Sequence, residues 1–173
     1  DRDRFIMSDG WNWGNKPTME LHPFDGASGE SIHCYTPSMI THSHKFKHRK
    51  DLKENLVWPP KGATNGVEWR EKNYIKKYQW QEAIDDGTFL FFGEFGCYQR
   101  TLPHAVYLAW LEDALKLCEK HGWGWALWNI DGPFGIMDTR SVDCEFEDFR
   151  GHKLDRKALD LLIKYAKRNK MVK

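Results

Sequence analysis

Hydrophobic and polar residues follow two alternating patterns along this chain. Continuous apolar runs, typical of strands buried on both faces, occur at residues 4–8, 31–35, 89–93 and 123–130. Segments between them carry apolar residues three or four positions apart, which is the spacing of an amphipathic helix. The clearest of these segments spans residues 103–121 and places on one face Leu108, Leu111, Leu115 and Cys118.

Two more helices complete the pattern. One is predicted over residues 68–85, and the other begins after Asp155, which we expect to cap it, and ends near Arg168. Residues 15–30 are predicted to be a non-helical link, and residues 37–66 a loop long enough to have a function. Strands that alternate with helices predict an α/β fold, with a parallel sheet and the helices outside it.

The chain length limits how much of such a fold can be present. A chain of 173 residues suits one domain over residues 1–173, whereas a complete eight-stranded α/β barrel needs about 250 residues. We therefore predict a half TIM barrel with four β/α units. Such a half-barrel exposes two strand edges and an apolar inner face. We expect a second copy, in a homodimer, or a missing N-terminal half-barrel to close it.

Composition excludes some classes of partner and favours another. The net charge of +1 argues against nucleic acid, and no apolar run approaches the length that spans a bilayer. Nine tryptophans are many for this length, and flat aromatic faces are typical of carbohydrate-binding clefts. Because the chain begins at Asp1, we expect a processed or truncated N-terminus.

The cysteines give no sign of a metal site. Their spacing contains no CxxC pair, so zinc is not expected, and the sequence implies no cofactor. Cys34 and Cys97 both lie at predicted strand ends, which leaves two alternatives open, a disulfide between them or free thiols.

The clearest chemical signal is Glu94, which directly follows the apolar run 89–93 and precedes Phe95 and Gly96. A carboxylate buried without a partner costs several kcal/mol, roughly. Catalytic groups of parallel barrels lie at the carboxyl ends of the strands, where Glu94 falls. The other predicted strands also end in polar or aromatic residues, and we expect all of them to converge at one face: Asp9, Trp11, Asn12, Trp13, His33, Tyr35, Trp128, Asn129 and Asp131.

Three motifs, in this order and spacing, resemble glycoside hydrolase family 5, the cellulase family. Residues 33–37 read His-Cys-Tyr-Thr-Pro, with Ile40-Thr41-His42 after them, and are similar to the end of the family's sixth strand. Residues 93–96 read Gly-Glu-Phe-Gly, as at the seventh strand, and residues 125–129 with 135–138 resemble the eighth.

The resemblance implies a retaining β-glycanase that hydrolyses a β-1,4-linked polysaccharide, and it implies secretion. Glu94 would be the nucleophile, positioned by His33 and Tyr35. Sugar-binding residues would be Trp128, Trp11, Trp13 and Asn129, and the long loop with Trp58 would line one side. The family's acid/base glutamate follows an asparagine on the fourth strand. No Asn-Glu pair occurs here, so the chain is expected to be the nucleophile-bearing half.

Other interpretations stay open from sequence alone. The chain could instead be a carbohydrate-binding half-barrel with little turnover, or a scaffold fragment with neither property. Glu94 could cap the next helix or pair with Arg100. His33, Tyr35 and Trp128 could simply pack in the core. Residues expected to be turn, cap or solvent-facing groups are Asp9, Asp131, His42, His44, His48 and the acidic run 143–148.

Overall fold

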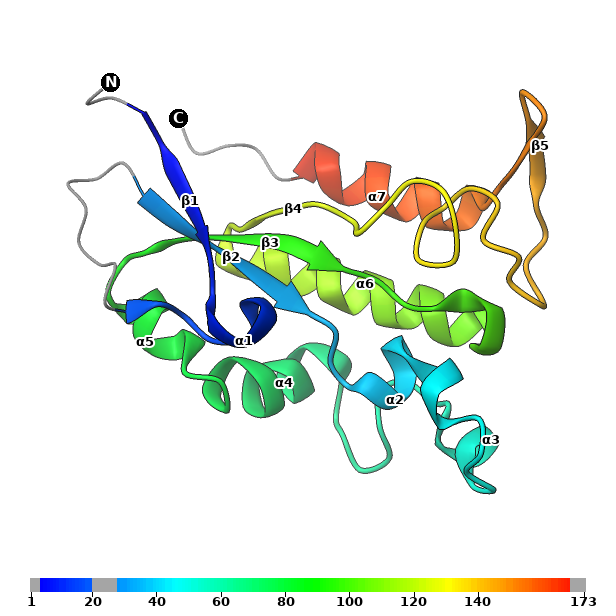
Figure 1. The fold of residues 1–173 in the computed structure, drawn as a ribbon, viewed down its shortest axis with the longest axis horizontal. Helices are drawn as coiled ribbons and strands as arrows, with labels where there is room; N and C mark the ends of the chain where they lie inside the picture. Colours follow the sequence, from blue (N-terminus) through cyan, green and yellow to red (C-terminus); the bar gives the residue numbers. More distant parts are fainter. Residues whose placement is uncertain (1–3, 20–27, 169–173) are drawn as a thin grey trace.

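The structure is a computed structural model that describes residues 4–19 and 28–168. Four parallel strands form one sheet in the order in which they follow along the chain (Figure 1). Their bounds are β1 Ile6–Asp9, β2 Ser28–Cys34, β3 Phe89–Phe95 and β4 Gly124–Trp125. Parallel strands in sequential order, with helices between β2 and β3, between β3 and β4, and after β4, make up a segment of an α/β barrel. This confirms the predicted α/β half-barrel.

Helices follow the strands and cover one face of the sheet. The two long ones pack against each other, α6 (His104–His121) and α7 (Arg156–Arg168). The others are α1 Trp11–Gly14, α2 Ser38–Thr41, α3 Leu52–Asn55, α4 Gly66–Arg70 and α5 Trp80–Asp85, with the π-helical turn η3 Glu71–Lys76 and the 3₁₀ turns η2 Ser43–Phe46 and η4 Gln99–Thr101. The helix α7 begins as predicted, because Oδ1 of Asp155 accepts a hydrogen bond from the backbone N–H of Ala158 at 3.0 Å.

Three predicted elements differ from the observed ones. The helix expected over residues 68–85 continues from α4 into the π-helical turn η3 and is then interrupted before α5, because Gln79 adopts a left-handed φ of 68°. The expected loop 37–66 contains α2, η2 and α3. The acidic run 143–148 leads into an antiparallel hairpin of β5 (Glu147–Phe149) and β6 (His152–Leu154), which the apolar pattern did not predict.

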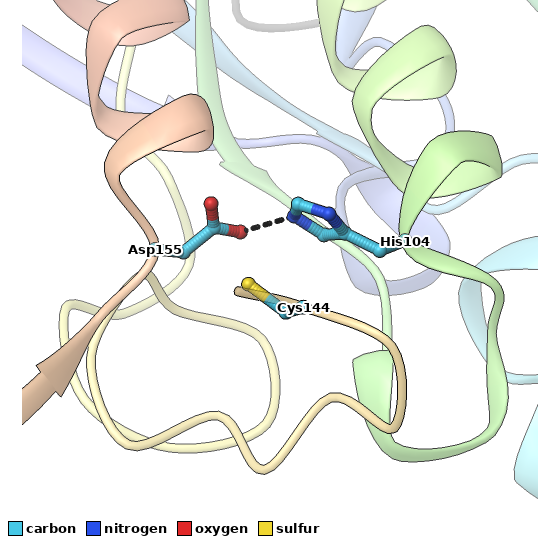
Figure 2. A group of neighbouring side chains, drawn as sticks. All are labelled: His104, Cys144 and Asp155. Atoms are coloured by element: carbon cyan, nitrogen blue, oxygen red, sulfur yellow. Dashed lines mark hydrogen bonds and ion pairs between the residues drawn. The ribbon is translucent and has the colours of Figure 1, made fainter. Parts of the chain in front are cut away.

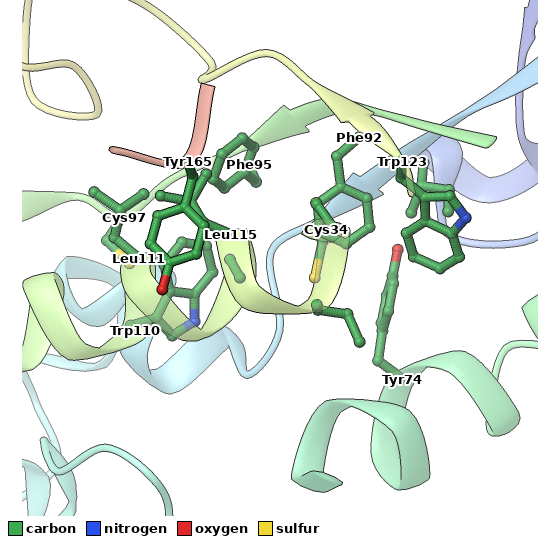
Figure 3. Packing of buried hydrophobic residues seen from close by; sticks show 14 of the residues in the cluster. Cys34, Tyr74, Phe92, Phe95, Cys97, Trp110, Leu111, Leu115, Trp123 and Tyr165 are labelled. Atoms are coloured by element: carbon green, nitrogen blue, oxygen red, sulfur yellow. The ribbon is translucent and has the colours of Figure 1, made fainter. Parts of the chain in front are cut away.

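The hydrophobic core lies between the sheet and the helices (Figure 3). Phe92 and Phe95 of β3 are fully buried against Trp110 and Leu111 of α6 and Tyr165 of α7. Cys34 and Cys97 are buried in the same core as free thiols, so the alternative of free thiols is the correct one. Within the described residues, no helix is long and apolar enough to cross a membrane.

The outer strands are less buried than predicted. Phe5, Ile6 and Met7 are 49%, 57% and 40% exposed, so the prediction of a buried strand at residues 4–8 is wrong. The reason is topological, since β1 is an edge strand that pairs with β2 alone. The predicted strand 123–130 also shortens to Gly124–Trp125, although the backbone N–H groups of Ala126 and Trp128 still donate to carbonyl groups of β3.

Candidate active site

A β-bulge aims Glu94 into the concave side of the sheet. Ile32 pairs with Phe92, but the next residue, His33, pairs with Glu94, so Gly93 is an extra residue in β3. Strict alternation would place Glu94 on the same face as the fully buried Phe92. The extra residue turns Glu94 to the other face, where His33 also lies. A Cβ atom at Gly93 would lie 2.0 Å from Oγ of Ser31, so any other residue at the bulge would have to displace the Ser31 side chain or the strand.

Two side chains contact Glu94: His33, which belongs to β2, and Tyr35, which directly follows β2. The hydroxyl of Tyr35 donates a hydrogen bond to Oε2 of Glu94 at 3.2 Å, and Nδ1 of His33 lies 3.5 Å from the same oxygen. Glu94 does not use its alternative partner, because Arg100 instead donates to the carbonyl oxygen of Thr139. The structure therefore brings the three predicted catalytic residues together.

Asp9 extends this group through the imidazole. Nε2 of His33 lies 3.0 Å from Oδ1 of Asp9, which is the last residue of β1. Because an ionised carboxylate can only accept hydrogen bonds, Nε2 carries a proton in this contact. The sequence suggested that Asp9 is only a turn or cap residue. In the structure, Asp9 also links β1 to the cluster on β2 and β3.

The hydroxyl of Tyr35 stays protonated. Burial, followed by the negative charge of Glu94, raises the pKa of Tyr35 well above its usual range. Thr41 supports this residue by donating a hydrogen bond from its hydroxyl to the carbonyl oxygen of Tyr35 at 2.8 Å. Tyr35 is therefore a fixed donor toward the carboxylate.

His42 differs from the expectation of a solvent-facing loop histidine. Its ring lies 5.2 Å from that of Tyr35 and 5.5 Å from that of Phe134, and it is half-buried. Burial, and then the positive charge of Lys45, lowers the pKa of His42 to about 4. His42 is therefore a neutral wall of the site near pH 7. His48 is exposed, as expected, whereas the ring of His44 lies 4.0 Å from that of Tyr98 at a tilt of 39°.

An open cleft of about 1060 Å³ contains this cluster. The cleft is lined by Asp9, His33, Tyr35 and Glu94, and Trp13 lies at its margin with 84% of its surface exposed. The loop predicted over residues 37–66 does supply part of the lining, through residues that include Lys45 and Phe46. Sequence reasoning missed the part that comes from α4, η3 and the residue after η3, which includes Trp69, Asn73 and Lys77.

Several predicted sugar-binding residues lie outside that lining. Trp11 and Trp128 are 62% and 48% exposed. The side-chain oxygen of Asn129 is buried, and among the described residues it has no hydrogen-bond partner. Trp58 does not line the cleft either, because its Nε1 donates to Asp113 at 3.0 Å and its ring covers Arg70.

Arg70 binds the segment that follows β2 from the buried side of the sheet. Its guanidinium is fully buried between the rings of Trp58 and Trp110, at 4.7 and 4.4 Å from their centroids. It donates to the carbonyl oxygens of Thr36 and Trp110 at 3.4 and 2.9 Å. Hydrophobic periodicity cannot predict a buried arginine of this kind, because its partners are backbone carbonyl groups and two distant rings.

The contacts of Glu94 involve one of its two carboxylate oxygens. A glycosidase nucleophile must be a carboxylate with fixed orientation and an open face toward the substrate. Tyr35 and His33 both contact Oε2, and among the described residues Oε1 has no recorded partner. Oε1 is therefore the oxygen that can reach a substrate in the cleft.

Known structures share this fold. A crystal structure of a glycoside hydrolase is 33% identical with a TM-score of 0.75, and the match covers 95% of this chain and 49% of that one. The cellulose synthase subunit Z of Clostridioides difficile is 23% identical with a TM-score of 0.65, covering 93% and 50%. Cel5A of Thermotoga maritima, in a mutant form with cellobiose, is 22% identical with a TM-score of 0.64, covering 92% and 47%. At 23% and 22% identity, the similarity to the last two structures shows a shared fold and nothing about function.

The chain spans about half the length of these solved structures. A comparison with curated proteins found no match. The sequence model of the cellulase family, glycosyl hydrolase family 5, matches residues 1–133, which include β1, β2, β3 and the cluster around Glu94. This chain belongs to the cellulase family, glycosyl hydrolase family 5.

Proposed function

We propose that this chain is the nucleophile-bearing half of a retaining β-glycanase that hydrolyses β-1,4-linked polysaccharide, with β-glucan as its substrate. The observation that carries the proposal is the hydrogen bond from Tyr35 to Oε2 of Glu94 within the open cleft. Family membership supports the reaction class.

In this proposal Oε1 of Glu94 attacks the anomeric carbon of the sugar. The C–O bond to the leaving group breaks, and a covalent glycosyl-enzyme forms. The hydrogen bond from Tyr35 holds Oε2, so that the carboxylate does not rotate away from the substrate, and the ring of His33 packs beside the same oxygen. Water then hydrolyses the intermediate, which returns Glu94 to its ionised form and gives net retention at the anomeric carbon.

The second carboxyl group of such a mechanism has to come from outside this cluster. Retaining enzymes place two carboxyl groups about 5–5.5 Å apart on opposite sides of the glycosidic bond. Asp9 and Glu94 are the carboxylates that line the cleft among the described residues. The ring of His33 lies between them and contacts both. Since an imidazole occupies the space that a sugar would need, we assign Asp9 to positioning rather than to acid/base chemistry.

We propose that a further half-barrel supplies the acid. The further half-barrel would cover two exposed apolar surfaces. One is formed at β1 by Phe5, Ile6 and Met7, and the other lies beyond β4 at Trp128 and Ile130. An N-terminal half of the same protein is the favoured source, because the chain covers 49% of the most similar structure reported above. A second copy is the alternative. Sedimentation of this chain as a monodisperse monomer would remove the homodimer.

The test of the nucleophile uses the full protein and a 2-deoxy-2-fluoro glycoside of cellobiose, which slows breakdown of the glycosyl-enzyme. Mass spectrometry should find the sugar on the peptide that contains Glu94, and Glu94→Gln should abolish both labelling and release of reducing sugar from soluble β-glucan. A label on another residue, or a wild-type rate in Glu94→Gln, would overturn the assignment.

A second candidate function is carbohydrate binding with little turnover. The high exposure of Trp13 beside the cleft favours it, since a flat exposed ring can stack on a sugar. Affinity electrophoresis in gels that contain β-glucan distinguishes the two functions. Retardation that Trp13→Ala removes, without any release of reducing sugar, would favour binding alone.

A further inference from the structure

Three side chains of different metal-binding types meet at the start of the two long helices (Figure 2). Nε2 of His104, Sγ of Cys144 and a carboxylate oxygen of Asp155 all lie within 4.8 Å of one another. They come from the first residue of α6, from the segment before β5 and from the residue before α7. None of them lines the cleft around Glu94.

The histidine and the aspartate are buried and oriented by other contacts. His104 is 5% exposed and Asp155 is fully buried, and Nε2 and Oδ2 are 2.7 Å apart. Oδ1 of Asp155 accepts from the backbone N–H of Ala158, while the backbone N–H of His104 donates to Oδ1 of Asp143 at 2.9 Å. The contact of the Asp155 carboxylate is of the kind that orients metal ligands in proteins, and the backbone contact of His104 anchors the start of α6.

Cys144 adds a third possible metal ligand, a thiol, to the histidine–aspartate pair. Its side chain points toward His104 and Asp155 in Figure 2. Its thiol makes a long contact of 3.7 Å with the carbonyl oxygen of Glu145 and a side-chain hydrogen bond with Asp155. Cys144 is half-buried, whereas the other cysteines are fully buried in the core, so solvent and ions can reach this thiol.

We propose that His104, Cys144 and Asp155 form a binding site for a zinc-type divalent cation. Imidazole, thiolate and carboxylate are together the donor set that Zn²⁺ prefers. One thiolate and one carboxylate balance its charge, so the bound site is neutral. Binding releases the thiol proton to solvent. The proton with which Nε2 of His104 now donates to Asp155 leaves that nitrogen, and the neutral imidazole takes up a proton on Nδ1 from solvent, so that Nε2 can bind the ion; a water molecule takes the fourth position.

The required change in geometry is small. Ligand atoms of a tetrahedral zinc ion are about 3.3–3.8 Å apart, given bond lengths of about 2.0–2.3 Å. The His104–Asp155 hydrogen bond would therefore open by roughly half an ångström, and Sγ of Cys144 would move inward. The ion would then join the start of α6, the segment before β5 and the start of α7, so it would stabilise the C-terminal part of the fold.

Metal titration of the full protein tests this site. After treatment with a chelator, addition of Zn²⁺ at a hundredfold excess over its dissociation constant should raise Tm by about 5–10 °C. Co²⁺ should give the intense thiolate-to-metal charge-transfer absorption together with the d–d bands of a tetrahedral site, with one ion bound per chain.

Cys144→Ser is the decisive variant, because it leaves the His104–Asp155 pair in place. It should lose the charge-transfer absorption and most of the Zn²⁺-dependent rise in Tm. Cys118→Ala, in the core of α6, and His48→Gln, at an exposed loop histidine, should retain both. No rise in Tm with Zn²⁺ in the unaltered protein, or an equal rise in Cys144→Ser, would overturn the proposal. The readouts do not depend on glycanase activity.

Discussion

The hydroxyl of Tyr35 donates a hydrogen bond to Oε2 of Glu94 at 3.2 Å, which joins the end of β2 to the end of β3. The contact selects one carboxylate oxygen and leaves the other toward the cleft. It depends on the bulge at Gly93, because only the shifted register places Glu94 beside His33 and on the same face as Tyr35.

Replacing Tyr35 with phenylalanine should lower kcat/KM about 10- to 100-fold, since hydrogen bonds to charged groups contribute about 1.5–3 kcal/mol. Most of the loss should be in kcat, with KM little changed, because the hydroxyl orients the nucleophile and the ring stays in place. Steady-state kinetics on soluble β-glucan measures both. Tyr98→Phe, which alters a tyrosine outside the cleft lining, should keep wild-type values. Equal losses in the two variants would contradict this role.

Gly93→Ala should destabilise the fold by about 1–3 kcal/mol, the usual cost of overpacking. The added Cβ would meet Oγ of Ser31 at 2.0 Å and its Cβ at 3.2 Å, so either the buried Ser31 side chain or β3 must shift. Urea denaturation measures the change in free energy of unfolding. Removing the obstructing oxygen in Ser31→Ala/Gly93→Ala should restore much of the stability. A double variant as unstable as the single one would show that this contact is not the cause.

Much of the site could be predicted from sequence because it lies within single strands. Two residues apart on one strand, His33 and Tyr35 must share a face. Glu94 could be assigned to the end of a strand from the apolar run before it. Its direction could not be assigned, because alternation from Phe92 points it into the core. The bulge that reverses it depends on the space beside Ser31, which lies 62 residues from Gly93 in sequence.

Other features need the tertiary structure. The apolar residues 4–8 indicated burial, but burial needs a neighbour on each side, and β1 has only β2. His42 lies in a polar, basic stretch, and nothing in that stretch predicts the rings of Tyr35 and Phe134 beside it. Secretion, implied by the family resemblance, stays a prediction.

Asp9→Asn should lower kcat/KM about 3- to 10-fold, because an exposed hydrogen bond that only positions another group contributes roughly 1 kcal/mol. The effect should pass through His33, whose Nε2 lies 3.0 Å from Asp9. Nitrogen-15 NMR of the imidazole reports which nitrogen carries the proton, and a merely structural role would not change it. Asp131→Asn, at an exposed aspartate outside the cleft, is the matched control. An unchanged His33 spectrum in Asp9→Asn would contradict the link.

His42 should make the protein less stable as the pH falls from about 6.5 to about 4. Its pKa is lowered to about 4 in the folded protein, so the unfolded chain binds more protons in this window and stability rises with pH. Because the ring is half-exposed, we expect about 1–2 kcal/mol after allowing for solvent screening. Tm measured between pH 7 and pH 4 should fall less in His42→Gln than in the unaltered protein. His48→Gln should follow the unaltered protein, since that ring is exposed in both states. Parallel curves for His42→Gln and the unaltered protein would show that His42 does not titrate in this window.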